Sequence, residues 1–158
     1  MQLPDLPLTA IAIGIHVADW RAAVTAAGDG LVRSGSTGPG YTKRMIDVID
    51  EFGAYVVIAP GLALAHARPG SDVIGEGLSV VTLAEPVAFG HPHNDPVSVV
   101  LGLAVTTGDE HVLLVAELAN LFNDPRVIPA LAAATDAAGI RSLLGVTAPA
   151  EEASGVRE

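Results

Sequence analysis

The chain has 158 residues and a mean hydropathy of +0.48; half of its residues are apolar and 16% are charged. This predicts a single domain with a sizeable core and excludes general disorder. There is no cysteine, so disulfides, zinc sites with Cys ligands and cysteine nucleophiles are excluded. Eighteen acidic residues against eight basic ones give a formal net charge of -10. That charge argues against binding of nucleic acid, which needs a basic patch.

The apolar stretches do not predict a membrane span. A spanning helix needs about 20 mostly apolar residues, and every apolar run here is shorter or is broken by polar residues. The N-terminus has no Lys or Arg before Arg21 and carries Asp5, which is unlike a signal peptide. We therefore expect a cytoplasmic protein.

The first third of the chain predicts a strand and two helices. Thr9–Val17 is a short apolar run with β-branched residues, typical of a strand. Asp19 is an expected N-cap for a helix over Trp20–Leu31. Apolar and polar residues recur with helical spacing over Tyr41–Glu51, and Gly53 ends this second helix.

The middle of the chain predicts three strands and one conspicuous loop. Ala54–Ala59 and Ser79–Leu83 are short apolar runs, and Ser98–Val105 is almost continuously apolar, as expected for a strand buried on both faces. Pro60–Gly70 directly follows the first of these strands and is punctuated by Pro and Gly, which is typical of a loop.

The last third predicts three helices and a tail. Glu110–Asn123 is amphipathic, and Val127–Ala134 and Ala137–Leu144 are shorter helices. Residues 147–158 are small, polar and acidic, which predicts a disordered tail. The apolar stripe of the first helix consists of His111, Val115, Leu118 and Phe122.

Helices that alternate with apolar strands predict an α/β fold. We expect a central mixed β-sheet of about five strands flanked by helices on both faces, a three-layer α/β/α arrangement. Residues 1–146 would form this single domain.

The five histidines are the natural candidates for chemistry, because an imidazole can act as nucleophile, acid or base near neutral pH. His66 lies in the loop after a strand, where α/β proteins place functional residues, although it could simply fix that loop. His111 starts a helix, whose N-terminus favours an anion, so it could donate an N–H to a phosphate oxygen; the alternative is a half-buried structural histidine. His16, within a predicted strand, is expected to be structural.

A metal site is a weaker interpretation of a second histidine pair. His91 and His93 could act with Asp95, but two nitrogens and one carboxylate are too few to specify a metal, and Asn-Asp-Pro is first of all a turn. The sequence also lacks the phosphate-binding P-loop, the dinucleotide-binding glycine motif and the Gly-x-Ser-x-Gly nucleophile motif.

Several segments together resemble one known family. The most specific are His66-Ala67-Arg68-Pro69 and the pair Phe89-Gly90 and Asn94-Asp95-Pro96-Val97. Over about residues 10–145 the pattern resembles the IIA component of the bacterial sugar phosphotransferase system (PTS), of the mannitol/fructose structural type (type-2 EIIA). The nearest branch is the ascorbate-specific IIA proteins. The accompanying segments are Asp19–Ala23, Val57–Ala63, Gly77–Leu83, Glu85–Val87 and Glu110–His111.

The resemblance implies a phosphotransferase that carries a phosphoryl group on histidine. The family's phospho-carrier histidine maps to His66, and the histidine that contacts the phosphoryl group maps to His111. The carrier protein HPr, in its phosphorylated form, would be the donor. A IIB component would accept the group, on a cysteine in this branch, and a membrane IIC component would transport the sugar. No metal and no cofactor is implied.

The sequence departs from the family pattern near the carrier. Ala65 stands where the family usually has Pro, and Asp50 stands where mannitol-type members have an arginine. Arg68 is a candidate to supply the missing positive charge, and His91 and Asp95 are further accessory candidates.

Three functional hypotheses follow. The first is a transport component for a sugar or sugar acid; because IIB and IIC choose the sugar, ascorbate is only a branch label. The second is a free-standing regulatory IIA-like module that senses PTS phosphorylation and binds partner proteins. The third is an unrelated metal-binding protein that uses His91 and His93. The apolar surplus also leaves room for a homodimer.

Overall fold

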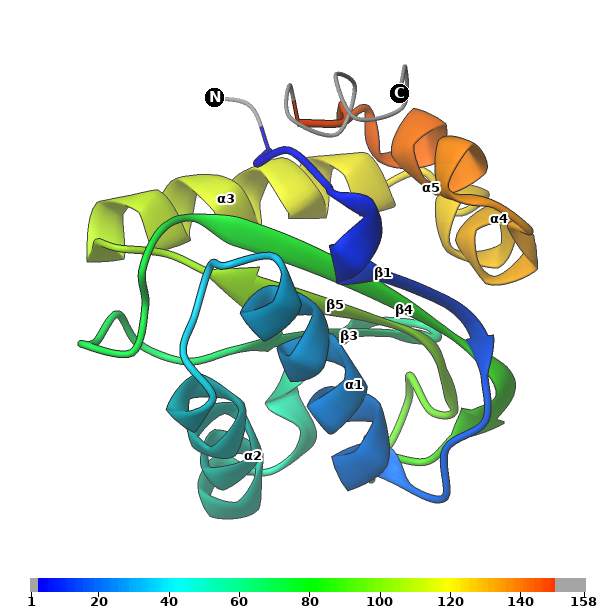
Figure 1. Ribbon diagram of the computed structural model, residues 1–158. Helices are drawn as coiled ribbons and strands as arrows, with labels where there is room; N and C mark the ends of the chain where they lie inside the picture. Colours follow the sequence, from blue (N-terminus) through cyan, green and yellow to red (C-terminus); the bar gives the residue numbers. More distant parts are fainter. Residues whose placement is uncertain (1–2, 150–158) are drawn as a thin grey trace.

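The computed structural model describes residues 3–149 (Figure 1). Within this range the chain forms five strands, five α-helices and two short 3-10 helices. In chain order they are η1 (Leu8–Ala10), β1 (Ile11–Ile15), α1 (Trp20–Arg33), α2 (Gly40–Phe52), η2 (Ala54–Val56), β2 (Val57–Ala59), β3 (Leu62–His66), β4 (Gly77–Val87), β5 (Val97–Ala104), α3 (Gly108–Phe122), α4 (Val127–Ala133) and α5 (Ala137–Leu144).

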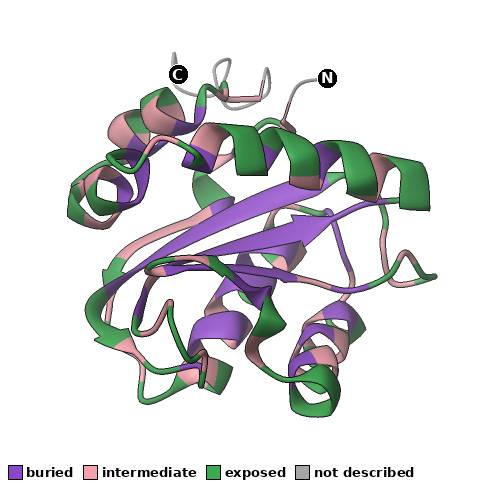
Figure 2. Cartoon of the chain, turned by 180° about the vertical axis from the view of Figure 1, so that it is seen from behind, coloured by how far each residue is buried: buried purple, intermediate pink, exposed green. Residues whose placement is uncertain are grey.

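The strands form one mixed sheet in the order β1-β4-β5-β3-β2. The pairs β1–β4 and β3–β5 are parallel, whereas β4–β5 and β2–β3 are antiparallel. The β4 and β5 strands at the centre are buried along most of their length (Figure 2). This agrees with the apolar run that the sequence shows at β5.

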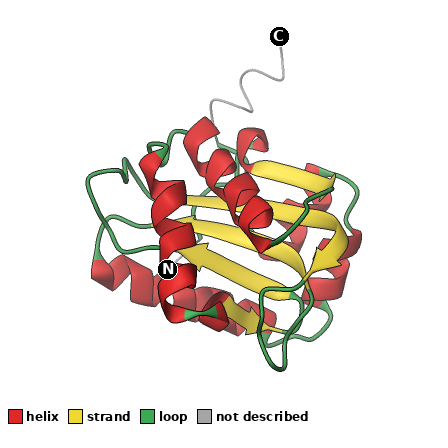
Figure 3. Cartoon of the chain, turned by 90° about the horizontal axis from the view of Figure 1, so that it is seen from below, coloured by secondary structure: helices red, strands yellow, loops and turns green. Residues whose placement is uncertain are grey.

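Helices cover both faces of the sheet, as predicted. Figures 1 and 3 show α1 and α2 on one face, and Figure 1 shows α3, α4 and α5 on the other. Two apolar cores result, one on each side of the strands. Alternate residues of a strand serve opposite cores: Leu64 packs toward α3–α5, and Ala63 and Ala65 pack toward α1 and α2.

The main correction concerns the segment between the second and third predicted strands. Pro60–Gly70 was expected to be a loop, but Leu62–His66 within it is β3. The glycine and prolines that suggested a loop lie at the ends of the strand: Gly61 adopts φ +82 in the turn from β2, and Pro69 follows the strand. Small alanines hid the strand from the sequence pattern, because its stability comes from pairing with β5 and β2.

Three smaller expectations also change. The first residues of the predicted strand Ala54–Ala59 form η2, so β2 has only three residues. The predicted strand over Thr9–Val17 shortens to β1, and His16 lies beyond its end with an exposed side chain. On α3 the deepest residues are Leu114, Leu118 and Phe122, whereas His111 and Val115 are only half-buried.

The topology brings the ends of two parallel strands together. His66 ends β3 in register with Leu103 of β5, and β5 then leads through Thr106 and Thr107 into α3. The carboxyl ends of parallel strands are where α/β folds place their sites. The first turn of α3 therefore lies beside His66.

The two ends of the described chain are joined. The Leu6 N–H donates to the Thr147 carbonyl at 3.0 Å, and the Thr147 hydroxyl donates to Asp5 at 2.9 Å. Thr147 is the first residue of the predicted tail; residues 150–158 of that tail lie outside the described range. In residues 3–149, none of the helices is long and apolar enough to cross a bilayer.

The contact between α1 and α2 gives a test of the packing. A Cβ at Gly28 would lie 2.1 Å from Thr42 Oγ1 and 2.8 Å from Thr42 Cβ, so rotation of the threonine cannot relieve the clash. We expect Gly28→Ala to lower the free energy of unfolding by about 1–3 kcal/mol, measured by urea denaturation. Gly108→Ala is the matched control, since a Cβ there meets nothing within 4 Å. Equal stability of the two variants would contradict this packing.

Candidate functional site

The two histidines singled out from the sequence lie side by side. His66 ends β3, and His111 lies in the first turns of α3. Their ring centroids are 4.8 Å apart and the ring planes are inclined by 42°. Two residues far apart in the sequence thus form one imidazole pair at the C-terminal end of β3.

The hydrogen bonds of His66 determine which ring nitrogen is free. Nδ1 lies 2.9 Å from the Leu64 carbonyl oxygen. A carbonyl can only accept, so Nδ1 carries the hydrogen and, in the neutral ring, Nε2 carries the lone pair. Nε2 is therefore the ring nitrogen that is chemically able to act as a nucleophile.

Burial keeps this imidazole neutral. Desolvation lowers the pKa of His66 below its usual value of 6.5, and the nearby His111 lowers it further. The hydrogen bond to Leu64 acts in the opposite direction but is weaker than the effect of burial. The neutral form, which can attack phosphorus, therefore predominates at pH 7.

The histidine pair opens into a pocket of about 600 Å³. Its lining combines apolar and polar side chains. The Tyr55 ring stands edge-on to His66 at 6.3 Å between centroids. The lining residues are Val48, Phe52, Tyr55, His66, Ala67, Arg68, Pro69, Gly108 and His111.

The N-terminus of α3 adds backbone donors to the pocket. Thr107 caps the helix, since its hydroxyl accepts from the Glu110 N–H at 3.1 Å. The N–H of Gly108, the first residue of the helix, has no carbonyl partner within the helix, and Gly108 lines the pocket. The Glu110 carboxylate accepts from the Thr106 N–H and hydroxyl, both at 2.9 Å, and this lowers its pKa. The Glu110 side chain thus ties the residue before the N-cap to the first turn of α3.

The segment after His66 is anchored by two residues of α2 that sequence reasoning missed. The Tyr41 hydroxyl accepts from the Ala67 N–H at 2.9 Å. Arg44 binds both carboxylate oxygens of Asp72, at 2.7 and 2.6 Å, and donates to the Arg68 carbonyl at 2.9 Å. All three partners lie more than twenty residues away in the chain, so no local pattern signals these contacts.

The residues that depart from the family pattern have clear structural settings. Ala65 is aligned with Gly102 in the β3–β5 ladder, a place where proline would lack an N–H. Asp50 forms an ion pair with Arg21 of α1, so that position supplies no cation. The Arg68 side chain is exposed at the His66 pocket and lowers the pKa of Tyr55, against the larger effect of burial.

His91 and Asp95 are not at this pocket, which corrects their expected accessory role. Their loop precedes β5, and Gly61 at the start of β3 donates to the Asn94 carbonyl at 3.0 Å. His66 lies five residues further along the extended chain, roughly 16 Å away at about 3.3 Å per residue. The loop is thus at the opposite end of the sheet from the histidine pair.

Asp95 and His91 instead form hydrogen bonds within their own loop. The Asp95 carboxylate accepts from the backbone N–H groups of Phe89, Gly90 and His91, at 3.0, 2.7 and 3.1 Å. His91 Nδ1 accepts from the N–H groups of His93 and Asn94. Among residues 3–149, no three His, Asp or Glu side chains gather to hold a metal ion.

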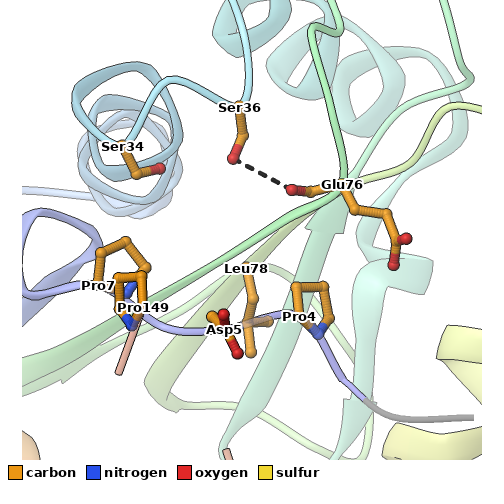
Figure 4. Close-up of a pocket in the computed structure, with 8 residues that line it drawn as sticks. All are labelled: Pro4, Asp5, Pro7, Ser34, Ser36, Glu76, Leu78 and Pro149. Carbon is orange, nitrogen blue, oxygen red and sulfur yellow. Dashed lines mark hydrogen bonds between the residues drawn. The ribbon is translucent and has the colours of Figure 1, made fainter. Parts of the chain in front are cut away.

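A second pocket, of about 490 Å³, lies between the N-terminal segment, the end of α1 and the start of β4 (Figure 4). Its two charged residues, Asp5 and Glu76, are both acidic, and the Ser36 hydroxyl donates to the Glu76 carbonyl at 3.4 Å. It shares no lining residue with the His66 pocket. Its charge does not suit a phosphoryl group.

Comparison with known proteins agrees with the geometry. The family model for the phosphoenolpyruvate-dependent sugar phosphotransferase system, EIIA 2, matches residues 6–145. The chain belongs to this family. The EIIA chain is also 36% identical, over 129 residues, to the ascorbate-specific PTS system EIIA component of Salmonella choleraesuis, with 81% of this chain and 84% of the relative covered.

Solved structures of other EIIA proteins share the fold. A PTS IIA (PtxA) from Streptococcus mutans superposes with a TM-score of 0.79 at 30% identity, covering 86% of each chain. The IIA chain in a complex of mannitol IIA with phosphorylated mannitol IIB from Escherichia coli gives 0.77 at 26% identity, covering 87% of this EIIA and 95% of that chain.

The tautomer and pKa of His66 can be measured directly. In long-range ¹H–¹⁵N NMR spectra we expect the Nδ1–H tautomer of His66 and a titration midpoint below pH 6.5, because the buried ring resists taking up charge. His66→Gln identifies the signal by removing it. A midpoint above 6.5, or a dominant Nε2–H tautomer, would contradict the described environment.

Proposed function

We propose that this EIIA protein is a phospho-carrier that accepts a phosphoryl group from phospho-HPr on His66 Nε2 and passes it to a cysteine of a IIB component. One observation carries the proposal: the Leu64 carbonyl binds Nδ1 of a neutral, partly buried imidazole and leaves Nε2 free beside His111.

The two transfers balance without a metal or cofactor. The Nε2 lone pair forms an N–P bond to the donor phosphorus, the N–P bond of the donor breaks, and its electron pair returns to the donor imidazole. In the second transfer a thiolate sulfur forms an S–P bond, and the electron pair of the breaking N–P bond returns to Nε2. Nδ1 keeps its proton throughout, since the Leu64 carbonyl holds it.

Three groups at the pocket are suited to the phosphoryl oxygens. His111 provides a ring N–H, the start of α3 provides the Gly108 N–H, and Arg68 provides the positive charge that Asp50 does not. Phosphoryl transfer depends on positioning and on stabilisation of the oxygens' charge, which these donors supply.

The surroundings of the pocket suit protein partners. Phe52 and Tyr55 line it with exposed fractions of 65% and 50%, and Val112, next to His111, is 65% exposed. Apolar side chains around a reactive group exclude water when a partner docks, and so protect the phosphohistidine from hydrolysis. The net charge of -10 suits a donor with basic groups around its own histidine.

A role in uptake of a sugar or sugar acid is favoured by the relative named as ascorbate-specific and by the mannitol IIA–IIB complex. The protein would work in the cytoplasm and reach the membrane through IIB and IIC.

The regulatory alternative uses the same phosphohistidine but needs no IIB acceptor. Transfer of label from the phosphorylated protein to a IIB encoded beside it separates the two roles.

The carrier assignment is tested by phosphorylation with enzyme I, HPr and labelled phosphoenolpyruvate. We expect one acid-labile, base-stable phosphate on His66 and loss of labelling in His66→Ala. His16→Ala, at an exposed position past β1, is the matched control and should label normally. Wild-type labelling of His66→Ala would refute the assignment.

The contribution of His111 can be measured separately. Removal of one donor to a developing charge typically slows a reaction about 100-fold, so we expect His111→Ala to accept phosphate far more slowly in rapid-quench experiments. His111→Gln retains an N–H donor and should recover part of the rate. Wild-type rates of both uptake and onward transfer in His111→Ala would exclude this role.

A further inference from the structure

The Tyr41 hydroxyl lies at the point where β3 and β5 separate. Tyr41 is fully buried in the second position of α2. Its hydroxyl donates to the Leu103 carbonyl at 2.6 Å and accepts from the Ala67 N–H at 2.9 Å. The Ala67 carbonyl is farther from the hydroxyl, at 3.3 Å, so the hydroxyl proton is directed at the Leu103 carbonyl.

These two backbone groups belong to the residues that decide how β3 ends. Leu103 is the ladder partner of His66, and Ala67 is the residue after it. In a parallel pair the next ladder bond would run directly from the Ala67 N–H to the Leu103 carbonyl. The hydroxyl lies between them and is bonded to both, which ends the strand at His66.

The position of Ala67 controls the imidazole. The His66 ring is held by a bond to Leu64, only two residues back, so its orientation depends on the backbone at His66 itself. A shift of Ala67 toward Leu103 would change the backbone at His66 and so disturb the hydrogen bond between His66 Nδ1 and the Leu64 carbonyl. Nearby, Arg44 lies 5.2 Å from the Tyr41 ring and holds the Arg68 carbonyl.

We infer that Tyr41 is a positioning residue for phosphoryl transfer: its hydroxyl, held between Ala67 and Leu103, sets the orientation of the His66 ring. The inference rests on the proposed function for its effect on rate, but not for its effect on the ring. Burial raises the pKa of Tyr41, so the hydroxyl keeps the proton that Leu103 accepts across the physiological range.

Tyr41→Phe tests this role because it removes one oxygen and leaves the buried ring. We expect the ¹⁵N signals of His66 to show a mixture of Nδ1–H and Nε2–H tautomers, where the wild type shows Nδ1–H. The kcat for phosphoryl acceptance should fall about 10- to 100-fold, as for a reacting atom displaced by about 1 Å. The KM for phospho-HPr should stay within twofold, because the docking surface is unchanged.

Ser79→Ala is the matched control. Ser79 is also fully buried, and its hydroxyl donates to the Ala27 carbonyl at 2.7 Å, on the α1 side of β4. The substitution removes a comparable hydrogen bond that involves neither Ala67 nor Leu103, so ring signals and kcat should match the wild type.

The outcomes separate the two proposals. Wild-type ring signals in Tyr41→Phe would overturn the inference whatever the transfer rate, as would an equal loss of kcat in Ser79→Ala. If the wild type takes up no phosphate, the proposed function fails, and the ring signals alone still decide the role of Tyr41.

Discussion

The hydrogen bond between His66 Nδ1 and the Leu64 carbonyl is the constraint from which the chemistry of the site follows. It assigns the proton to Nδ1 and the lone pair to Nε2. The bond forms because His66 is the last residue of β3 and its ring folds back over the strand to the Leu64 carbonyl, two residues earlier. β3 provides that end only because β5 pairs with it up to Leu103 and no further. Which ring nitrogen of His66 is free is thus tied to the point where the β3–β5 ladder ends.

Under the proposed function, the site would hold an anion in a protein with a net charge of -10. The donors available for it are local: the N–H of the helix start, the ring of His111 and the guanidinium of Arg68. Two of the nearby acids are already bound. Glu110 is tied to Thr106, and Asp72 is paired with Arg44. The same interactions hold the backbone of the pocket, because Glu110 accepts from the Thr106 N–H and Arg44 also donates to the Arg68 carbonyl.

The aliphatic composition suits this architecture. Aromatic residues make up only 4% of the chain, and alanines of β3 belong to the same core as Tyr41 of α2. The long Tyr41 side chain crosses this core, and its hydroxyl reaches backbone atoms of both β3 and β5. The opposite face packs leucines against α3, α4 and α5 and thereby fixes the helix that carries His111.

The sequence by itself determined the three-layer α/β class and most helices, and it singled out His66 and His111 as candidates, because helical periodicity, caps such as Asp19 and the His-Ala-Arg-Pro motif are local signals. It did not reveal β3, whose small residues become a strand only against β5, nor the roles of Tyr41 and Arg44, whose partners are distant in the chain. It also suggested His91 and Asp95 as accessories, because residue type carries no information on which end of the sheet a loop occupies. Only the tertiary structure decided that, since strand order and direction arise from contacts between segments that no local pattern encodes.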